Sequence, residues 1–175
     1  MALKKPISTD DHILGDSNAK IELVEYGDYQ CPYCGDFHFT IKKLLQDFPN
    51  DLKFIFRNFP LDFHQYALHA AIASEVLDKH NKFWSMHDLL FENQNALDDQ
   101  NLINYAHQLG LSAKEFETEF ANKALLNKID NDIESGLHSG VNGTPSLYIN
   151  GKKYRGDYSY SVLFKLIQKL LQNQN

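Results

Sequence analysis

The sequence is poor in cysteine, with only Cys31 and Cys34 among its 175 residues. A chain of this length can bury a full core, and 43% of its residues are hydrophobic. Disulfide bonds are therefore not needed to stabilise the fold. In a reducing compartment, two cysteines favour a catalytic pair over a structural bond.

The sequence also has no excess of positive charge and no long apolar run, and no signal peptide is visible in it. The net charge of −6 and the pI near 5.7 give no electrostatic footprint for nucleic acid. No stretch approaches the ~20 apolar residues of a membrane span, and no apolar run follows residues 1–6. We expect one domain over residues 1–175, in the cytoplasm, or in the periplasm if a leader has been removed.

The two cysteines form a C-P-Y-C motif at residues 31–34. After Pro32, apolar residues recur at steps of three and four, which predicts a helix, and proline suits a first helical position. Cys31 then lies at the N-cap, where free N–H groups and the helix dipole favour a thiolate. Cys34 faces the predicted core. We therefore expect Cys31 to be the attacking sulfur and Cys34 to be the resolving one.

Two other interpretations of the cysteines remain open. A structural zinc site needs four ligands, whereas one C-x-x-C pair supplies two, and no histidine pair follows at zinc-finger spacing. His64 and His69 come nearest, but they lie in an alanine-rich stretch that we predict to be helical. The second alternative is a pair of inert buried cysteines, which Pro32 and the strand–turn–helix context disfavour.

The N-terminal part of the chain predicts a βαβ unit. Residues 1–19 are polar and rich in turn signals, so we expect an arm on the surface. Residues 21–26 are strand-like and end at Gly27, a helix is expected over residues 32–48, and residues 52–59 form a second strand before Pro60. Two strands joined by a crossover helix are expected to be parallel.

The middle of the chain, residues 61–138, has almost no strand signal and is predicted to be helical. Ser112 and Glu115 form a capping box, and Gly110 occupies the favoured position after a helix. The predicted helices of this block cover residues 64–79, 81–91, about 98–109, 112–120 and about 124–137.

Strand signals return after Gly140. Residues 146–149 and 152–155 flank Asn150-Gly151, a strong hairpin signal, and a last helix is expected over residues 159–171. The order predicts an α/β fold with a mixed sheet of about four strands and an all-helical insertion.

Several stretches resemble the DsbA-like family of thioredoxin-fold thiol–disulfide oxidoreductases. The resemblance extends from about Asp11 to the C-terminus. It implies a thioredoxin core at about 13–60 and 139–173, with the helical insertion at about 61–138. The matching stretches are V-E-Y-G-D at 24–28, C-P-Y-C at 31–34, F-W-S-M-H-D-L-L at 83–90, and G-V-N-G-T-P at 140–145 before I-N-G at 149–151.

The resemblance also implies the activity and its partners. These are exchange of disulfides with protein substrates through the dithiol, with a redox partner protein or glutathione, and with no cofactor or metal. It implies that Pro145 is cis and lies against the dithiol, so that the Thr144 backbone can hold an extended substrate by strand-type hydrogen bonds. Pro32 and Tyr33 are expected to contact the substrate beside it. From the sequence alone, an ordinary trans proline at a strand start is the alternative for Pro145.

Glu25 lies within an apolar strand, six positions before Cys31, where the family carries a buried acid. We expect Glu25 to relay a proton to or from Cys34, with its pKa raised by burial. The alternative is a glutamate at the strand edge that points to water. Glu22, three positions earlier, is predicted to lie on the opposite face.

The sequence between the two cysteines differs from that of the strongly oxidising members of the family. The strongly oxidising members have histidine where this chain has Tyr33, and tyrosine cannot supply the charge that helps to hold a thiolate. We therefore expect a less oxidising couple, within the broad range of about −270 to −120 mV for such folds. The alternative function is a non-catalytic module that binds extended peptides or folding clients.

Overall fold

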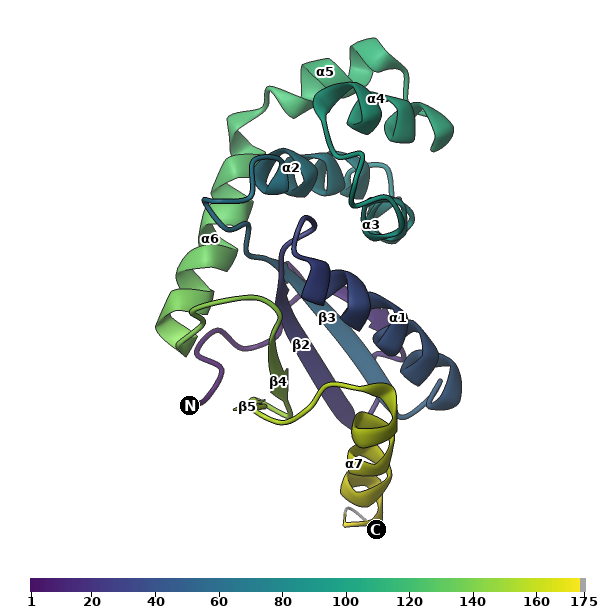
Figure 1. Ribbon diagram of the computed structural model, residues 1–175, viewed down its shortest axis with the longest axis vertical. Coiled ribbons are helices and arrows are strands. Elements are labelled where there is room, and N and C mark those ends of the chain that lie inside the picture. Colours follow the sequence, from purple (N-terminus) through teal and green to yellow (C-terminus); the bar gives the residue numbers. More distant parts are fainter. Residues whose placement is uncertain (174–175) are drawn as a thin grey trace.

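The computed structural model describes residues 1–173, so residues 174 and 175 of the expected domain lie outside the described part of the chain. Residues 1–173 form five strands and seven helices, arranged as a sheet at one end and a helical block at the other (Figure 1). The strands are β1 (His12–Gly15), β2 (Ile21–Gly27), β3 (Leu52–Asn58), β4 (Ser146–Ile149) and β5 (Lys152–Lys153). The helices are α1 (Pro32–Asp47), α2 (Ala67–Asp78), α3 (Phe83–Glu92), α4 (Asp99–Gln108), α5 (Ala113–Phe120), α6 (Lys123–Ser139) and α7 (Tyr160–Gln172).

The sheet is mixed, with strand order β1-β3-β2-β4-β5. β2 and β3 are parallel, as the βαβ pattern predicts, and the other three pairings are antiparallel. β2 therefore lies at the centre, and Glu25 pairs with Phe56 on one side and with Leu147 on the other.

The two faces of the sheet have different covers. Alternate residues of the central strand point to opposite faces, so Leu23 joins the core that includes α1 and α7, while Val24 and Tyr26 join a smaller cluster beside α6. Glu25 follows Leu23 by two residues and shares its face. The central acid thus points toward the helix that carries both cysteines.

The strand count differs from the expectation of about four because β1 forms part of the predicted surface arm. β1 pairs with the outer edge of β3, with His12 opposite Phe56. Asp11 and His12 are buried. The prediction of a surface arm is therefore wrong for these residues.

The hairpin prediction is confirmed at its turn, where Asn150 and Gly151 both have positive φ, 48° and 75°. Its second strand is shorter than expected and ends at Lys153. The capping box of Ser112 and Glu115 is present, and Gly110 has φ 87° after α4. The helix predicted from His64 begins three residues later, at Ala67.

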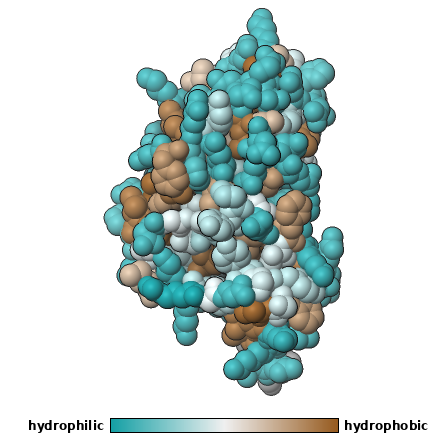
Figure 2. Space-filling view, viewed as in Figure 1, coloured by the Kyte–Doolittle hydropathy of each residue, from teal (hydrophilic) through white to brown (hydrophobic). Residues whose placement is uncertain are grey.

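None of the helices within residues 1–173 has the length and apolar character needed to cross a membrane. Figure 2 shows hydrophilic residues over most of one face of the molecule, with separate hydrophobic patches between them. Large exposed apolar side chains include Tyr33, Phe39 and Phe63. The first of these lies beside the cysteines.

Candidate functional site

Cys31 is the N-cap residue of α1, with Pro32 opening the helix. Cys31 has extended backbone angles, φ −73° and ψ 119°, so its side chain lies at the end of the helix where backbone N–H groups lack helical partners. Both cysteines are free thiols, and both are buried. Cys31 therefore lies at a helix N-terminus, as the sequence predicted.

The pKa of the Cys31 thiol is lowered to about 5. The largest cause is a hydrogen bond from the Cys34 side chain, and burial opposes it. The backbone N–H groups of Cys34 and Tyr33 lower the pKa further. A thiol with this pKa is almost wholly a thiolate at pH 7, and the thiolate is the nucleophilic form of cysteine.

Cys34 has the opposite character. Its side chain is fully buried on the inner face of α1, together with Phe37, Ile41 and Leu44. Burial raises the pKa of Cys34 well above its ordinary value, and the neighbouring Cys31 and Glu25 act in the same direction. The pair therefore holds one ionised sulfur near the helix end and one protonated sulfur behind it.

Glu25 is buried beneath this pair. Burial raises the pKa of the Glu25 carboxyl to about 8; a hydrogen bond with Cys34 opposes the rise, and the charge of Cys31 adds to it. Among the described residues, Glu25 Oε1 has no hydrogen-bond partner. The structure therefore contradicts the alternative of a water-facing glutamate, and it is Glu22 that is half exposed, paired with Lys53 at 3.0 Å.

The Thr144–Pro145 peptide bond is cis, as the family resemblance implied. Cys31 Sγ lies 3.4 Å from the backbone oxygen of Thr144, to which the protonated thiol can donate, although 113 residues separate the two in sequence. Pro145 comes directly before β4. The loop therefore places a strand start against the reactive sulfur.

Pro32 and Tyr33 lie on the outer side of the site. Both are exposed, and the Tyr33 side chain is 61% exposed. The predicted substrate-contacting residues are thus divided between the exposed start of α1 and the cis-proline loop. Cys31 lies in contact with both segments.

Asp28 belongs to the site and was not predicted. Its buried carboxylate accepts hydrogen bonds from the backbone N–H of Gln30 at 2.7 Å and of Cys31 at 3.2 Å. The carboxylate therefore fixes the turn that leads from β2 into α1. The Gly-Asp sequence before the motif was a usable signal, because aspartate accepts backbone N–H groups two and three positions later in such turns.

Gln94 is a second residue that the sequence did not indicate. It follows α3 in the chain, and its side-chain amide donates to the backbone oxygens of Tyr29 and Cys31, both at 2.8 Å. A methyl group at Gly35 would overlap Gln94 Oε1. The helical block thus contacts the motif directly, through a partner 63 residues away that no local pattern reveals.

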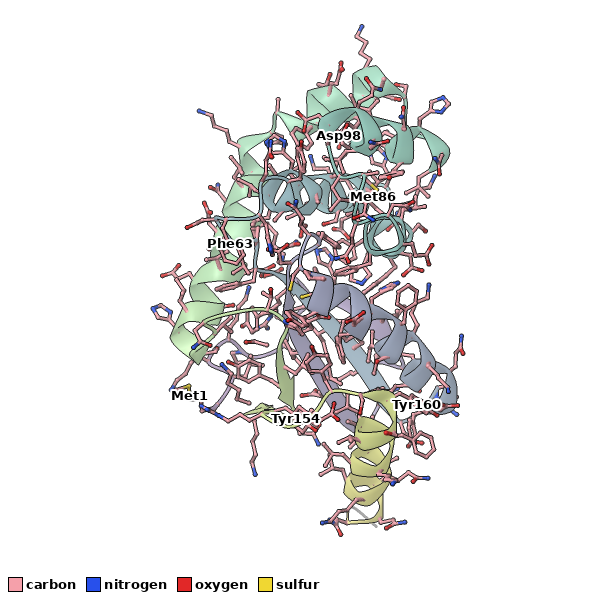
Figure 3. The ribbon with its side chains drawn as sticks, in the orientation of Figure 1. Met1, Phe63, Met86, Asp98, Tyr154 and Tyr160 are labelled. Carbon is pink, nitrogen blue, oxygen red and sulfur yellow. The ribbon has the colours of Figure 1, made fainter. Side chains whose placement is uncertain are left out.

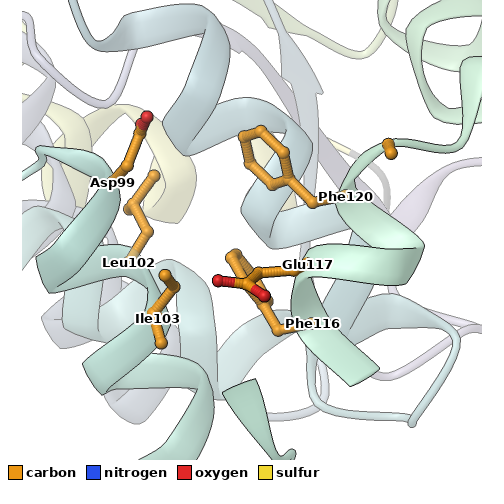
Figure 4. Close-up of a pocket in the computed structure, with 7 residues that line it drawn as sticks. Asp99, Leu102, Ile103, Phe116, Glu117 and Phe120 are labelled. Carbon is orange, nitrogen blue, oxygen red and sulfur yellow. The ribbon is translucent and has the colours of Figure 1, made fainter. Parts of the chain in front are cut away.

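The described residues contain no group of three or more histidine, cysteine, aspartate or glutamate side chains that could hold a metal ion. A separate hollow of about 220 Å³ opens between α4 and α5, with apolar walls and two carboxylates (Figure 4). None of the predicted site residues lines it. Its lining consists of Asp99, Leu102, Ile103, Phe116, Glu117, Phe120 and Ala121.

Comparison with solved structures gives matches over nearly the whole chain. BdbD from Bacillus subtilis, in its oxidised form, is 26% identical with a TM-score of 0.85, and the match covers 98% of each chain. α-DsbA1 from Wolbachia pipientis is 25% identical with a TM-score of 0.83, over 98% of this chain and 95% of that one. A sequence model of a family described as thioredoxin matches residues 8–169.

The chain belongs to the DsbA-like family of thioredoxin-fold proteins. The family resemblance and the thioredoxin-like α/β fold inferred from the sequence are therefore confirmed. The DsbA-like neighbours support thiol–disulfide oxidoreductase activity in general.

Among curated proteins, the chain is 37% identical over 163 residues to a protein of Salinispora arenicola named as a Na⁺/H⁺ antiporter. The match covers 92% of this chain and 25% of the antiporter. The chain thus spans about a quarter of the length of the curated relatives that it matches.

Proposed function

We propose that the protein exchanges disulfides with protein substrates through the Cys31–Cys34 dithiol. The observation that carries the proposal is the asymmetry of the pair. The pKa of Cys31 is lowered to about 5, chiefly by a hydrogen bond from Cys34, while burial raises the pKa of Cys34. Cys31 is thus ionised and able to attack, and Cys34 keeps its proton until the mixed disulfide forms.

The reaction begins when the Cys31 thiolate attacks one sulfur of a substrate disulfide. A bond forms between Cys31 Sγ and that sulfur, the substrate disulfide breaks, and the other substrate sulfur leaves as a thiolate. Cys34 then attacks Cys31 Sγ and displaces the first substrate sulfur. The substrate gains two electrons, and the protein is left with a Cys31–Cys34 disulfide. The reverse sequence oxidises a substrate dithiol.

Glu25 serves the second step by accepting the proton that Cys34 must lose before it attacks. Burial, and then the charge on Cys31, raise the pKa of Glu25 to about 8. That charge disappears when Cys31 enters the mixed disulfide, so the pKa of Glu25 falls when a proton acceptor is needed. In the reverse direction, the protonated carboxyl returns a proton to the Cys34 thiolate.

The substrate binds as an extended segment beside the cis-proline loop. Thr144 precedes Pro145 and β4, so its backbone lies at a strand start where an added strand can pair. Because Cys31 Sγ lies 3.4 Å from Thr144 O, a segment paired with this loop would lie next to the reactive sulfur. Exposed Pro32 and Tyr33 provide the facing surface. A redox partner protein or glutathione would then reset the dithiol.

The test uses one preparation in two assays, reduction of insulin and oxidation of a reduced client protein. We expect activity in at least one assay and none with Cys31→Ser. Cys34→Ser should accumulate a mixed disulfide at Cys31, because the resolving sulfur is absent. Binding of the client without exchange in either assay, and with no mixed disulfide in Cys34→Ser, would favour the non-catalytic module and overturn the proposal.

A further inference from the structure

The carboxylate of Asp28 joins the active-site turn to the loop that follows β3. While one oxygen holds the turn before α1, the other accepts the backbone N–H of Leu61 at 2.8 Å and the Nδ1–H of His64 at 2.8 Å. The Asp28 side chain is fully buried, and that of His64 is 18% exposed. Four hydrogen bonds to one buried carboxylate fix its position, because each bond limits the movement that would break the others.

His64 is positioned for this contact by its own loop. Its backbone N–H donates to Leu61 O at 2.9 Å, and its backbone oxygen accepts from Ala67 N at 3.1 Å. The ring packs edge-on against Phe63, with 4.5 Å between centroids, and Phe63 itself is 77% exposed at the side of the molecule (Figure 3). Among the four donors to Asp28 in the described part of the chain, the imidazole is thus the one side-chain donor.

We propose that His64 is a positioning residue for Cys31, acting through Asp28: the imidazole holds the carboxylate, and the carboxylate holds the Cys31 N–H at the start of α1. The inference rests on the proposed function, because it assigns His64 to the same exchange reaction.

The consequence for Cys31 follows from the geometry of the N-cap. The thiolate is stabilised partly by the backbone N–H groups of Tyr33 and Cys34, which face Sγ only while Cys31 keeps its extended conformation. A looser carboxylate lets the Cys31 backbone move, and these N–H groups then lose their alignment with the sulfur. Loss of the His64 donor therefore raises the pKa of Cys31.

Other charged groups surround the proposed contact. The hollow beside His64 is also lined by Asp62, His69 and Asp130, and Cys31 is faced by Cys34 and, from the central strand, by Glu25. Of these groups, the variants described below change only His69, and only in the control. They also leave three backbone N–H groups bonded to the Asp28 carboxylate.

The test measures the rate of alkylation of Cys31 by iodoacetamide against pH, in the reduced protein with both cysteines present. We expect His64→Leu to move the midpoint upward by about one pH unit, which lowers the rate at pH 5 about fivefold and leaves the rate at pH 8.5 almost unchanged. His64→Asn should restore the midpoint, because its side-chain amide can donate from the position of Nδ1.

The matched control is His69→Leu, which removes a histidine bonded to Asp99 at 2.6 Å on the exposed surface; its midpoint should equal that of the parent. A midpoint in His64→Leu equal to the parent's overturns the proposal, as does a shift that His64→Asn fails to reverse. If Cys31 of the parent protein does not titrate below pH 7, the proposed function fails. A parent that titrates below pH 7 with an unshifted His64→Leu variant defeats the role of His64 alone.

A measurement on the unmodified protein keeps the proposal testable if His64→Leu does not fold. Nitrogen NMR of the histidine ring should show a proton on His64 Nδ1 at pH 7 that exchanges slowly with solvent. A ring protonated only at Nε2 could not donate to Asp28 and would overturn the inference.

Discussion

Replacing Glu25 with glutamine tests whether the carboxyl group at the centre of the sheet is protonated in the folded protein. Burial raises its pKa to about 8 in the fold, from an ordinary value of 4.5. Between these values the folded protein binds a proton that the unfolded chain has released. The contribution of Glu25 to stability therefore falls as the pH rises through this window.

The size of the effect follows from the same two values. Each pH unit within the window costs about 1.4 kcal/mol, so at pH 7 the buried carboxyl lowers the free energy of unfolding by about 3 kcal/mol. Glutamine has no proton to lose in this range, so it does not carry this pH-dependent cost. Its amide is nevertheless buried where Glu25 Oε1 has no hydrogen-bond partner among the described residues, which costs about 1–3 kcal/mol at every pH.

The assay is urea unfolding of reduced protein at pH 5, 6, 7 and 8, and the quantity compared is the stability of Glu25→Gln minus that of the parent. The difference is needed because the lowered pKa of Cys31 makes its own contribution rise with pH over much of the same range. We expect the difference to grow by about 1.4 kcal/mol per pH unit.

Glu22→Gln is the matched control, since it makes the same change on the same strand at a half-exposed carboxylate paired with Lys53. Its difference from the parent should stay nearly constant with pH. A Glu25→Gln difference that is equally flat from pH 5 to 8 would refute the assignment of a protonated carboxyl beneath the cysteines.

Three further predictions concern the cysteine pair and the buried charges. Cys34→Ala removes the hydrogen bond that is the largest cause of the low pKa of Cys31, so thiolate absorbance near 240 nm should titrate with a midpoint above 5; an unchanged midpoint would contradict that cause. Asp11→Leu leaves Arg57 buried without the carboxylate it contacts at 2.7 Å, and urea unfolding should show a loss of about 3–5 kcal/mol, whereas a loss below about 1 kcal/mol would count against the ion pair. Burial lowers the pKa of His87 well below its ordinary value, so parent stability should fall as the pH drops below about 6.5, and His87→Phe should show a shallower fall; equal slopes would contradict a neutral buried imidazole.

The sequence predicted the elements whose signals are local. The spacing of apolar residues after Pro32 gave α1, and the Asn150-Gly151 turn gave the hairpin, because side-chain periodicity and turn chemistry act within a few residues. The same local argument placed Cys31 at a helix N-terminus. The family resemblance added the cis bond before Pro145, which no periodicity indicates.

Strand β1 escaped prediction because its partner is distant. The four residues His12–Gly15 are flanked by turn signals, and their strand conformation is set by pairing with the edge of β3 some 40 residues away. His12 adds to this placement through hydrogen bonding with Glu75 at 2.8 Å and stacking on Phe83. Tertiary contacts of this kind outweigh local preference.

The site was predicted only where its chemistry is carried by the motif. Asp28 and Gln94 both bond to the Cys31 backbone. Asp28 also bonds to Leu61, which is 33 positions away in the sequence, and Gln94 is 63 positions away from Cys31. His64 was predicted to lie within a helix, whereas the helix begins at Ala67 and His64 lies in the loop before it. Its contact with Asp28 depends on the packing of two loops, which the sequence of neither loop encodes alone.

The proposed activity requires Cys31 and Cys34 to form a reversible redox pair. The most direct test equilibrates the protein in a series of glutathione buffers, quenches it with acid, labels the free thiols and counts them by mass spectrometry. We expect one two-electron transition between a form with two free thiols and a form with none, and loss of that transition in Cys31→Ser. Two thiols that remain free across the whole series would contradict it.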